Sequence, residues 1–224
     1  MKSRIKTDTL ILVISIIVTV PIFFIRKLYP VNLFWDNIFD VIGIILILKG
    51  NLIRMMARGH KRTNSQQGEM LVMTGLYSIV RNPMYLGSFL VGTGFILLLW
   101  PFWVLFIFAL IFYLRFNRQM LKEEVLLKRN FGKKYEEYCQ KTPRFFPSIQ
   151  NILRIESKKY LDLKEAFSTK EKWGLLTWIA LAFVLEIIQE KFVFQSFSIS
   201  SAGIVFLSAI LLYGILLSLK NKLG

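Results

Sequence analysis

The apolar residues of this chain are gathered into long runs, and the segments between them are rich in lysine and arginine. A helix that crosses a hydrocarbon core of about 30 Å needs about 20 predominantly apolar residues. Runs that approach this length cover residues 9–25, 33–49, 84–116, 173–188 and 197–219. The pattern therefore predicts membrane-spanning helices.

The run over residues 84–116 is too long for one span, because its 33 residues would extend about 50 Å as a helix. Trp100-Pro101 lies near its middle, and proline breaks a helix interior. We therefore expect a hairpin of two helices, and about six helices in all. The first run follows three basic residues, as a signal peptide would. Because no small-residue cleavage site follows it and further spans do, we expect a retained helix.

The basic residues predict how the helices are oriented. The chain carries 29 Lys and Arg against 14 Asp and Glu. If the N-terminus is inside, 26 of the basic residues fall in inner segments, and only Arg26, Lys27 and Lys191 fall outside. This is the positive-inside asymmetry of membrane proteins. We expect an integral, multi-pass membrane protein with both termini cytoplasmic, whose charge requires no nucleic-acid partner.

Composition excludes other classes of protein. A hydrophobic fraction of 54% and a mean hydropathy of +0.51 do not fit a disordered chain or an ordinary soluble enzyme. Cys139 is the single cysteine and His60 the single histidine, so the chain forms no internal disulfide and no usual zinc or haem site. We expect no metal.

Two polar segments flank the predicted hairpin and carry the most chemistry. Residues 74–87 read TGLYSIVRNPMYLG, which places an arginine, an asparagine and two tyrosines at the cytoplasmic mouth of the bundle. Residues 123–147 read EEVLLKRNFGKKYEEYCQKTPRFFP. Apolar and acidic residues recur at helical spacing from Met120 to Phe131, and Gly132 is predicted to end that helix.

In this order, the two segments resemble the motifs of the integral-membrane isoprenylcysteine carboxyl methyltransferase family and its phospholipid methyltransferase relatives. Those motifs are G-x-Y-x-x-x-R-H-P-x-Y-x-G and E-E-x-x-L-x-x-x-F-G-x-x-Y-x-x-Y, and the resemblance covers about residues 40–147. It implies an all-α, multi-pass transmembrane bundle with a cytoplasmic helical region that binds S-adenosyl-L-methionine. We expect a methyltransferase core over residues 1–147, an interfacial amphipathic segment over 148–171 and a C-terminal helix pair over 172–224.

The resemblance also assigns roles to residues. By motif matching, the cofactor contacts fall on Glu69, Met70, Leu71, Val72, Tyr77, Asn82, Pro83, Met84, Tyr85 and Glu123. Tyrosine rings offer π faces to a sulfonium, an asparagine amide can pair with adenine, and a carboxylate accepts hydrogen bonds from a ribose or an ammonium group. Each of these residues also has a structural alternative. Tyr77 and Tyr85 are compatible with residues of the membrane interface, Asn82-Pro83 with the start of a helix, and Glu123 and Glu124 with a solvated helix face.

Two departures from the family pattern concern the acceptor. Asn82 stands where the family usually has histidine, and Gln119 stands where it has a substrate-facing arginine. We expect substrate contacts at Arg115, Arg118 and Gln119, and catalytic roles for Arg81 and Glu124. A carboxylate acceptor is already ionised at pH 7 and needs no base, whereas an amine must lose a proton, which Glu124 can assist.

The predicted function is therefore methylation of a lipid-like acceptor from the bilayer, above all carboxyl O-methylation of a prenylated, isoprenylcysteine-type substrate. N-methylation of phosphatidylethanolamine is the alternative within the family. A small transporter or scaffold is the non-enzymatic alternative, and Asp36, Asp40 and Glu186 inside predicted spans are compatible with either an ion path or a structural role. A nicotinamide-dependent reductase would need a phosphate-binding signature, which we do not find. The glycines at 87, 92 and 94 are predicted to allow close helix packing.

Overall fold

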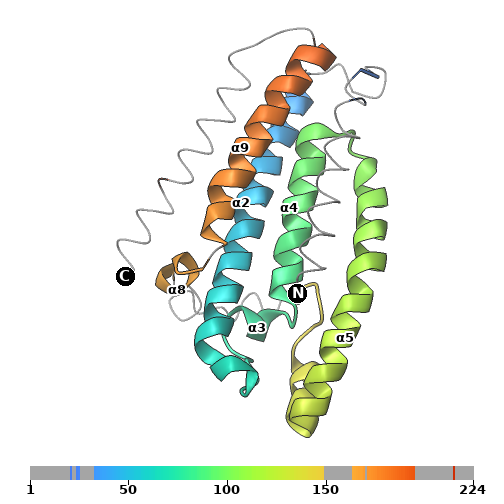
Figure 1. Cartoon of the computed structure of the whole chain (residues 1–224). Helices are drawn as coiled ribbons and strands as arrows, with labels where there is room; N and C mark the ends of the chain where they lie inside the picture. Colours follow the sequence, from blue (N-terminus) through green and yellow to red (C-terminus); the bar gives the residue numbers. More distant parts are fainter. Residues whose placement is uncertain are drawn as a thin grey trace.

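The computed structural model describes residues 33–148, 163–169 and 171–194, together with residues 21, 24, 25 and 214. All regular structure in these residues is helical, which confirms the all-α prediction for them. Figure 1 shows the long helices α2, α4, α5 and α9 running side by side. Apart from residues 21, 24, 25 and 214, the predicted first and last spans lie outside the described residues, as does most of the predicted interfacial segment.

Helix α2 covers Leu33–Asn64 and is longer than the predicted span over residues 33–49. It continues because no proline interrupts residues 50–64, and because Met55 and Ala57 are buried on its inner side. The extra turns extend beyond the apolar part of the helix, and their basic residues lie at the same height in the bundle as the first motif. A 3-10 turn, η2 (Gln66–Gly68), follows.

The hairpin is confirmed. Helix α4 covers Pro83–Leu99 with proline in its first turn, and helix α5 covers Val104–Lys141, with Pro101 in the break between them. Gly132 adopts φ 51° and ψ −127°, a left-handed conformation that favours glycine. The helix therefore breaks at the predicted residue, and the chain resumes as helix up to Lys141.

Glycines bring α2 and α4 into close contact. A Cβ on Gly50 would lie 2.5 Å from the Gly87 carbonyl oxygen, and one on Gly94 would lie 2.5 Å from the Gly43 carbonyl oxygen. The two pairs are seven residues apart on each helix, so the antiparallel helices touch twice along one seam. This confirms that the glycines of α4 serve helix packing.

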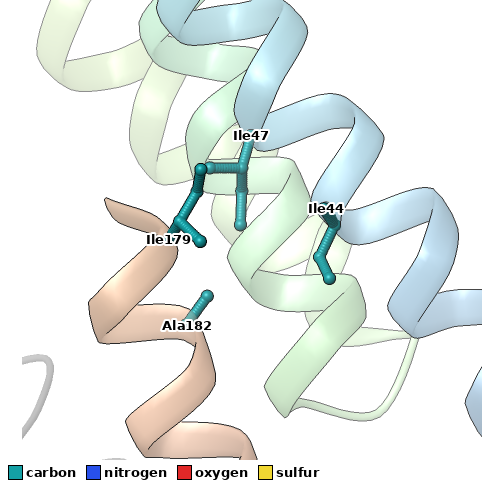
Figure 2. A pocket seen from close by; sticks show the side chains of 4 residues that line it. All are labelled: Ile44, Ile47, Ile179 and Ala182. Atoms are coloured by element: carbon teal, nitrogen blue, oxygen red, sulfur yellow. The ribbon is translucent and has the colours of Figure 1, made fainter. Parts of the chain in front are cut away.

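Helix α9 covers Lys172–Gln189 and continues as a π-helical turn, η3 (Glu190–Phe194). It packs on α2 through buried apolar residues, and the short helix α8 (Leu163–Phe167) covers the lower part of α2. Figure 2 shows a small apolar hollow between α2 and α9, lined by Ile44, Ile47, Ile179 and Ala182.

One described helix, α5 (Val104–Lys141), is long and apolar enough to cross a membrane, and α4 is a shorter apolar helix. Large apolar side chains of α5 are exposed along one stretch, among them Phe106 (76%), Leu110 and Ile111. Such exposure is costly in water and is the usual state of a lipid-facing helix. The apolar helix supports membrane character.

Candidate active site

The two sequence motifs meet where the first turn of α4 lies against the middle of α5. The Tyr85 hydroxyl donates a hydrogen bond to Glu123 Oε1 at 2.7 Å, and Gln119 Nε2 donates to the same oxygen at 3.1 Å. Tyr85 is buried, and its ring packs on Phe116 with centroids 5.4 Å apart. Three residues that the sequence assigned to cofactor or substrate are thus brought into one cluster.

Tyr77 lies on the short helix α3 (Leu76–Ile79), next to this cluster. Its side chain is only 8% exposed and packs with Ala57 and Val72, and Met84 lies against them. The Tyr138 hydroxyl donates to the Tyr77 carbonyl oxygen at 2.5 Å, so the resumed part of α5 fixes the backbone of α3.

The residues after α5 fold back across the first motif. The Arg81 backbone N–H donates to the Pro143 carbonyl at 2.9 Å, and Asn82 Nδ2 donates to the Arg144 carbonyl at 3.1 Å. Asn82 is also the N-cap residue of α4, without a side-chain capping bond. Its amide therefore holds the end of the second motif against the first, a contact that the sequence pattern did not reveal.

Glu124 lies between two guanidinium groups. Its Oε1 is 3.2 Å from Arg81 Nη1 and 3.1 Å from Arg144 Nε, and Arg144 Nη1 donates to Asn117 Oδ1 at 2.8 Å. Arg81 Nη1 also donates to Cys139 Sγ at 2.7 Å. Burial alone would lower the pKa of Arg81, but Glu124 and Cys139 beside it outweigh this effect and raise it. Glu124 thus links Arg81 to Arg144, and Cys139 is part of the same network.

The charges around Tyr77 have both signs. Burial raises the pKa of the Tyr77 phenol, the nearby Glu123 carboxylate raises it further, and Arg58 lowers it. Arg58 Nη2 lies 3.1 Å from Glu171 Oε1 at the start of α9. Glu123 and Arg58 therefore flank a neutral phenol with a negative and a positive group.

Arg54 makes a second link at this level of α2. It pairs with Glu171 at 3.0 Å and donates to Ser88 Oγ of α4 at 2.8 Å. Sequence reasoning missed both arginines and Glu171, although the i, i+4 spacing of Arg54 and Arg58 on a continued helix could have indicated a shared face.

The other predicted residues are spread around the cluster. Glu69 and Met70 are exposed after η2, Leu71 is half-buried, and Pro83 is buried in the first turn of α4. Arg115 lies over the Phe116 ring at 5.4 Å, and Arg118 is exposed on α5. His60, the single histidine, has its Nε2 2.8 Å from Thr74 Oγ1 and supports the turn at Gly75.

Comparison with known proteins shows which families and relatives the chain resembles. Residues 39–134 match the model of the phospholipid methyltransferase family. These residues, which are less than half of the chain, are similar to that family. The protein-S-isoprenylcysteine O-methyltransferase of Schizosaccharomyces pombe is 36% identical over 80 residues, which are 36% of this chain and 34% of the relative. That of Xenopus laevis is 32% identical over 121 residues, which cover 50% and 42% of the two chains.

The relatives do not all carry the same name. The nickel-cobalt-cadmium resistance protein NccN of Alcaligenes xylosoxydans xylosoxydans is 31% identical over 118 residues, which are 52% of each chain. The chain spans between 34% and 61% of the length of the curated relatives it matches. No solved structure matches it.

Proposed function

We propose that this protein is a membrane methyltransferase that uses S-adenosyl-L-methionine and acts on a lipid-like acceptor. The observation that carries the proposal is the hydrogen bond from Tyr85 to Glu123, which joins the two family motifs in one partly buried cluster. The names of the relatives from Schizosaccharomyces pombe and Xenopus laevis favour an isoprenylcysteine-type acceptor, with its carboxylate as the methylated group.

The donor set of the cluster fits the proposed cofactor. S-adenosyl-L-methionine supplies, when bound, a methyl group on a positively charged sulfur. The π faces of Tyr77 and Tyr85 would hold that cation, and Glu123 would hold the ribose hydroxyls or the ammonium group. The carbonyl oxygen of Asn82 would accept from the adenine amino group, since its Nδ2 donates to Arg144. The remaining proposed contacts are Glu69, Met70, Leu71, Val72, Pro83 and Met84.

A cluster of aromatic rings beside Tyr85 would exclude water from the site. Phe112 and Phe116 lie with ring centroids 4.3 Å apart, and Phe89 contacts Phe112 at 5.1 Å and Phe145 at 5.7 Å. Removing water strengthens interactions with charged groups, which favours transfer from a cationic donor. The same apolar surface would receive the first part of the acceptor's lipid chain.

The acceptor head would be held by Arg115, Arg118 and Gln119 on α5. A carboxylate there is ionised at neutral pH, so the site has no proton to remove. Glu124 would act through Arg81 and Arg144, by fixing the fold of the two motifs around the cluster. If the acceptor is a carboxylate, Arg81 and Glu124 would therefore position the two motifs and would take no part in a proton transfer.

The proposed setting is a multi-pass membrane protein with both termini cytoplasmic. The core over residues 1–147 would carry the reaction, the segment over 148–171 would lie along the inner surface, and the helix pair over 172–224 would complete the bundle. The cofactor would enter from the cytosol and the acceptor from the bilayer.

A second candidate is phosphatidylethanolamine N-methylation, which the description of the matching family favours. An amine acceptor must be deprotonated, so its rate would rise with pH, whereas a carboxylate would give a rate that is nearly flat between about pH 6 and 9. Transfer of a tritiated methyl group to a farnesylcysteine analogue and to phosphatidylethanolamine, over that pH range, separates the two.

Binding of the cofactor tests the site itself. Glu123→Gln and Tyr85→Ala should weaken S-adenosyl-L-methionine binding by about 1–2 kcal/mol or more, the usual value of a charge-assisted or cation–π contact. Calorimetry on the purified protein measures this, with Glu137→Gln, an exposed glutamate on the same helix, as the control. Unchanged affinity in both folded variants would contradict the proposed site, and no binding by the wild type would favour a transporter or scaffold.

A further inference from the structure

A second polar cluster lies between α2 and α9, away from the candidate active site. Asp36 and Asp40 of α2 and Glu186 of α9 each offer a carboxylate oxygen, and these three atoms lie within 4.8 Å of one another. Asp40 is 17 residues before Ala57. At ~1.5 Å per residue, this places the cluster about 25 Å along α2 from the residues that pack on Tyr77.

Two of the three carboxylates in this cluster are buried without partners outside it, and the third, Asp36, is half-buried. Asp40 is 1% exposed and Glu186 is 0% exposed, and among the described residues none of their four carboxylate oxygens has a hydrogen-bond partner outside the cluster. Gln189 lies one helical turn after Glu186, on the same face of α9. It is 2% exposed, and its amide oxygen is also without a partner in the described part of the chain.

This arrangement is expensive unless a cation compensates it. A buried carboxylate without a partner loses its hydration and gains nothing in return, and several in one place also repel each other. The salt bridges between described residues involve none of these three carboxylates. Two helices thus bring carboxylate oxygens together at one position, where two of the three carboxylates are buried.

The spacing of the oxygen atoms selects the kind of cation. Two ligands on opposite sides of an ion are separated by twice the metal–oxygen distance. This gives about 4.6–5.2 Å for Ca²⁺ but only about 4.0–4.2 Å for Mg²⁺. The observed limit of 4.8 Å fits Ca²⁺ without movement of the helices.

We propose that Asp36, Asp40 and Glu186, with the Gln189 amide oxygen, form a binding site for a large, oxygen-preferring divalent cation such as Ca²⁺. The ion would join the upper halves of α2 and α9. The site is independent of methyl transfer and has no part in the chemistry at Tyr85 and Glu123.

Equilibrium dialysis of the purified full-length protein with radioactive calcium, at pH 8 in detergent, tests the proposal. The wild type should bind about one Ca²⁺ per chain, and Mg²⁺ should compete at least about tenfold less well. Asp40→Asn and Glu186→Gln should each weaken Ca²⁺ binding at least about tenfold. Glu137→Gln, the same change at an exposed site, should bind as the wild type does.

A measurement on the wild type alone covers the case in which a variant fails to fold. Tb³⁺, which replaces Ca²⁺ in oxygen sites, should give luminescence sensitised by Trp35, the neighbour of Asp36, and excess Ca²⁺ should abolish it. The proposal is overturned if the folded wild type binds no Ca²⁺, or if Glu186→Gln binds it equally well. Carboxyl groups that only share a proton with each other would give the first of these results.

Discussion

The polar groups of this protein are buried in two regions that differ in how they are compensated. Around the candidate active site, Glu123 accepts from Tyr85 and Gln119, and Glu124 is paired with two arginines. At the other end of α2, the carboxylates of Asp40 and Glu186 have no oppositely charged partner among the residues that the structure describes. A network of oppositely charged, hydrogen-bonded groups holds a fixed shape, whereas buried carboxylates without partners outside their own cluster are what the proposed cation would compensate. A glutamate-to-glutamine substitution should therefore lower the stability of the protein in the first region and raise it in the second.

Both regions depend on α2, so the largest effect is expected where α2 touches α4. Gly50→Leu would place a side chain 2.5 Å from the Gly87 carbonyl, and backbone on both sides leaves it no space. We expect the free energy of unfolding to fall by more than about 4 kcal/mol, so that the protein does not fold. Thermal unfolding in detergent measures this, with Ala180→Leu at an exposed position of α9 as the control for added volume. A folded Gly50→Leu protein would mean that the two helices can separate without harm.

In the partnered region, Glu124→Gln should destabilise the fold by about 3 kcal/mol. The change leaves Arg81 and Arg144 facing each other without a counter-ion, which is costly in a partly buried site. Denaturation of the variant against the wild type measures the loss. Glu136→Gln is the matched control, because Glu136 forms an exposed ion pair with Lys128 on the same helix and should hardly change stability. Equal losses of stability in the two variants would mean that Glu124 contributes no more to the fold than an exposed ion pair does.

In the unpartnered region, Glu186→Gln should stabilise the protein by about 1–2 kcal/mol when calcium is chelated at pH 9. Removing one buried negative charge relieves repulsion, and a buried charge replaced by a neutral group of similar volume is often stabilising. Thermal unfolding with and without Ca²⁺ measures the change in stability. Without the ion, the variant should be more stable than the wild type. With Ca²⁺, the wild type should be stabilised and the variant should not. A destabilised variant in chelator would mean that Glu186 has a structural partner.

The sequence predicted the first region better than the second. Proline and glycine act locally, so the breaks at Pro101 and Gly132 and the start of α4 at Pro83 followed from residue type alone. The motifs predicted that Tyr85 and Glu123 belong to one site, since a hairpin brings its two ends together. The extension of α2 to Asn64 was not predicted, because hydropathy marks where an apolar run ends and not where a helix ends.

Contacts between distant segments were beyond the sequence pattern. Nothing in the spacing of residues 142–147 indicated that they fold back onto Arg81 and Asn82. Likewise, Asp40 and Glu186 are 146 positions apart, and their proximity depends on which helix packs against α2. Each looked like an isolated charge in a span. Such pairings depend on tertiary packing, which a single sequence does not encode in any local period.

The smallest predicted effect concerns the phenol that joins the two motifs. Burial, and then the neighbouring Tyr77 and Tyr135, raise the pKa of Tyr138 above its usual value of 10.0, and its hydroxyl donates to the Tyr77 carbonyl. Above about pH 10 the unfolded chain loses this proton while the folded chain keeps it. The unfolded state then binds fewer protons, so stability must fall as pH rises, by up to about 1.4 kcal/mol per pH unit for one group. Below pH 10 both states are protonated and stability should not change on this account.

Tyr138→Phe should therefore cost about 1 kcal/mol at neutral pH, the value of one hydrogen bond, and should make the alkaline loss of stability less steep. Unfolding followed from pH 8 to 12 measures both quantities. Tyr113→Phe, the same change at an exposed position of α5, should leave the slope as in the wild type. If Tyr138→Phe also keeps the wild-type slope, the phenol ionises alike in the folded and unfolded chains. The contact between the second motif and α3 would then be accessible to solvent. Tyr138 would not belong to a buried, hydrogen-bonded network, and the contrast between the two regions would not hold at this residue.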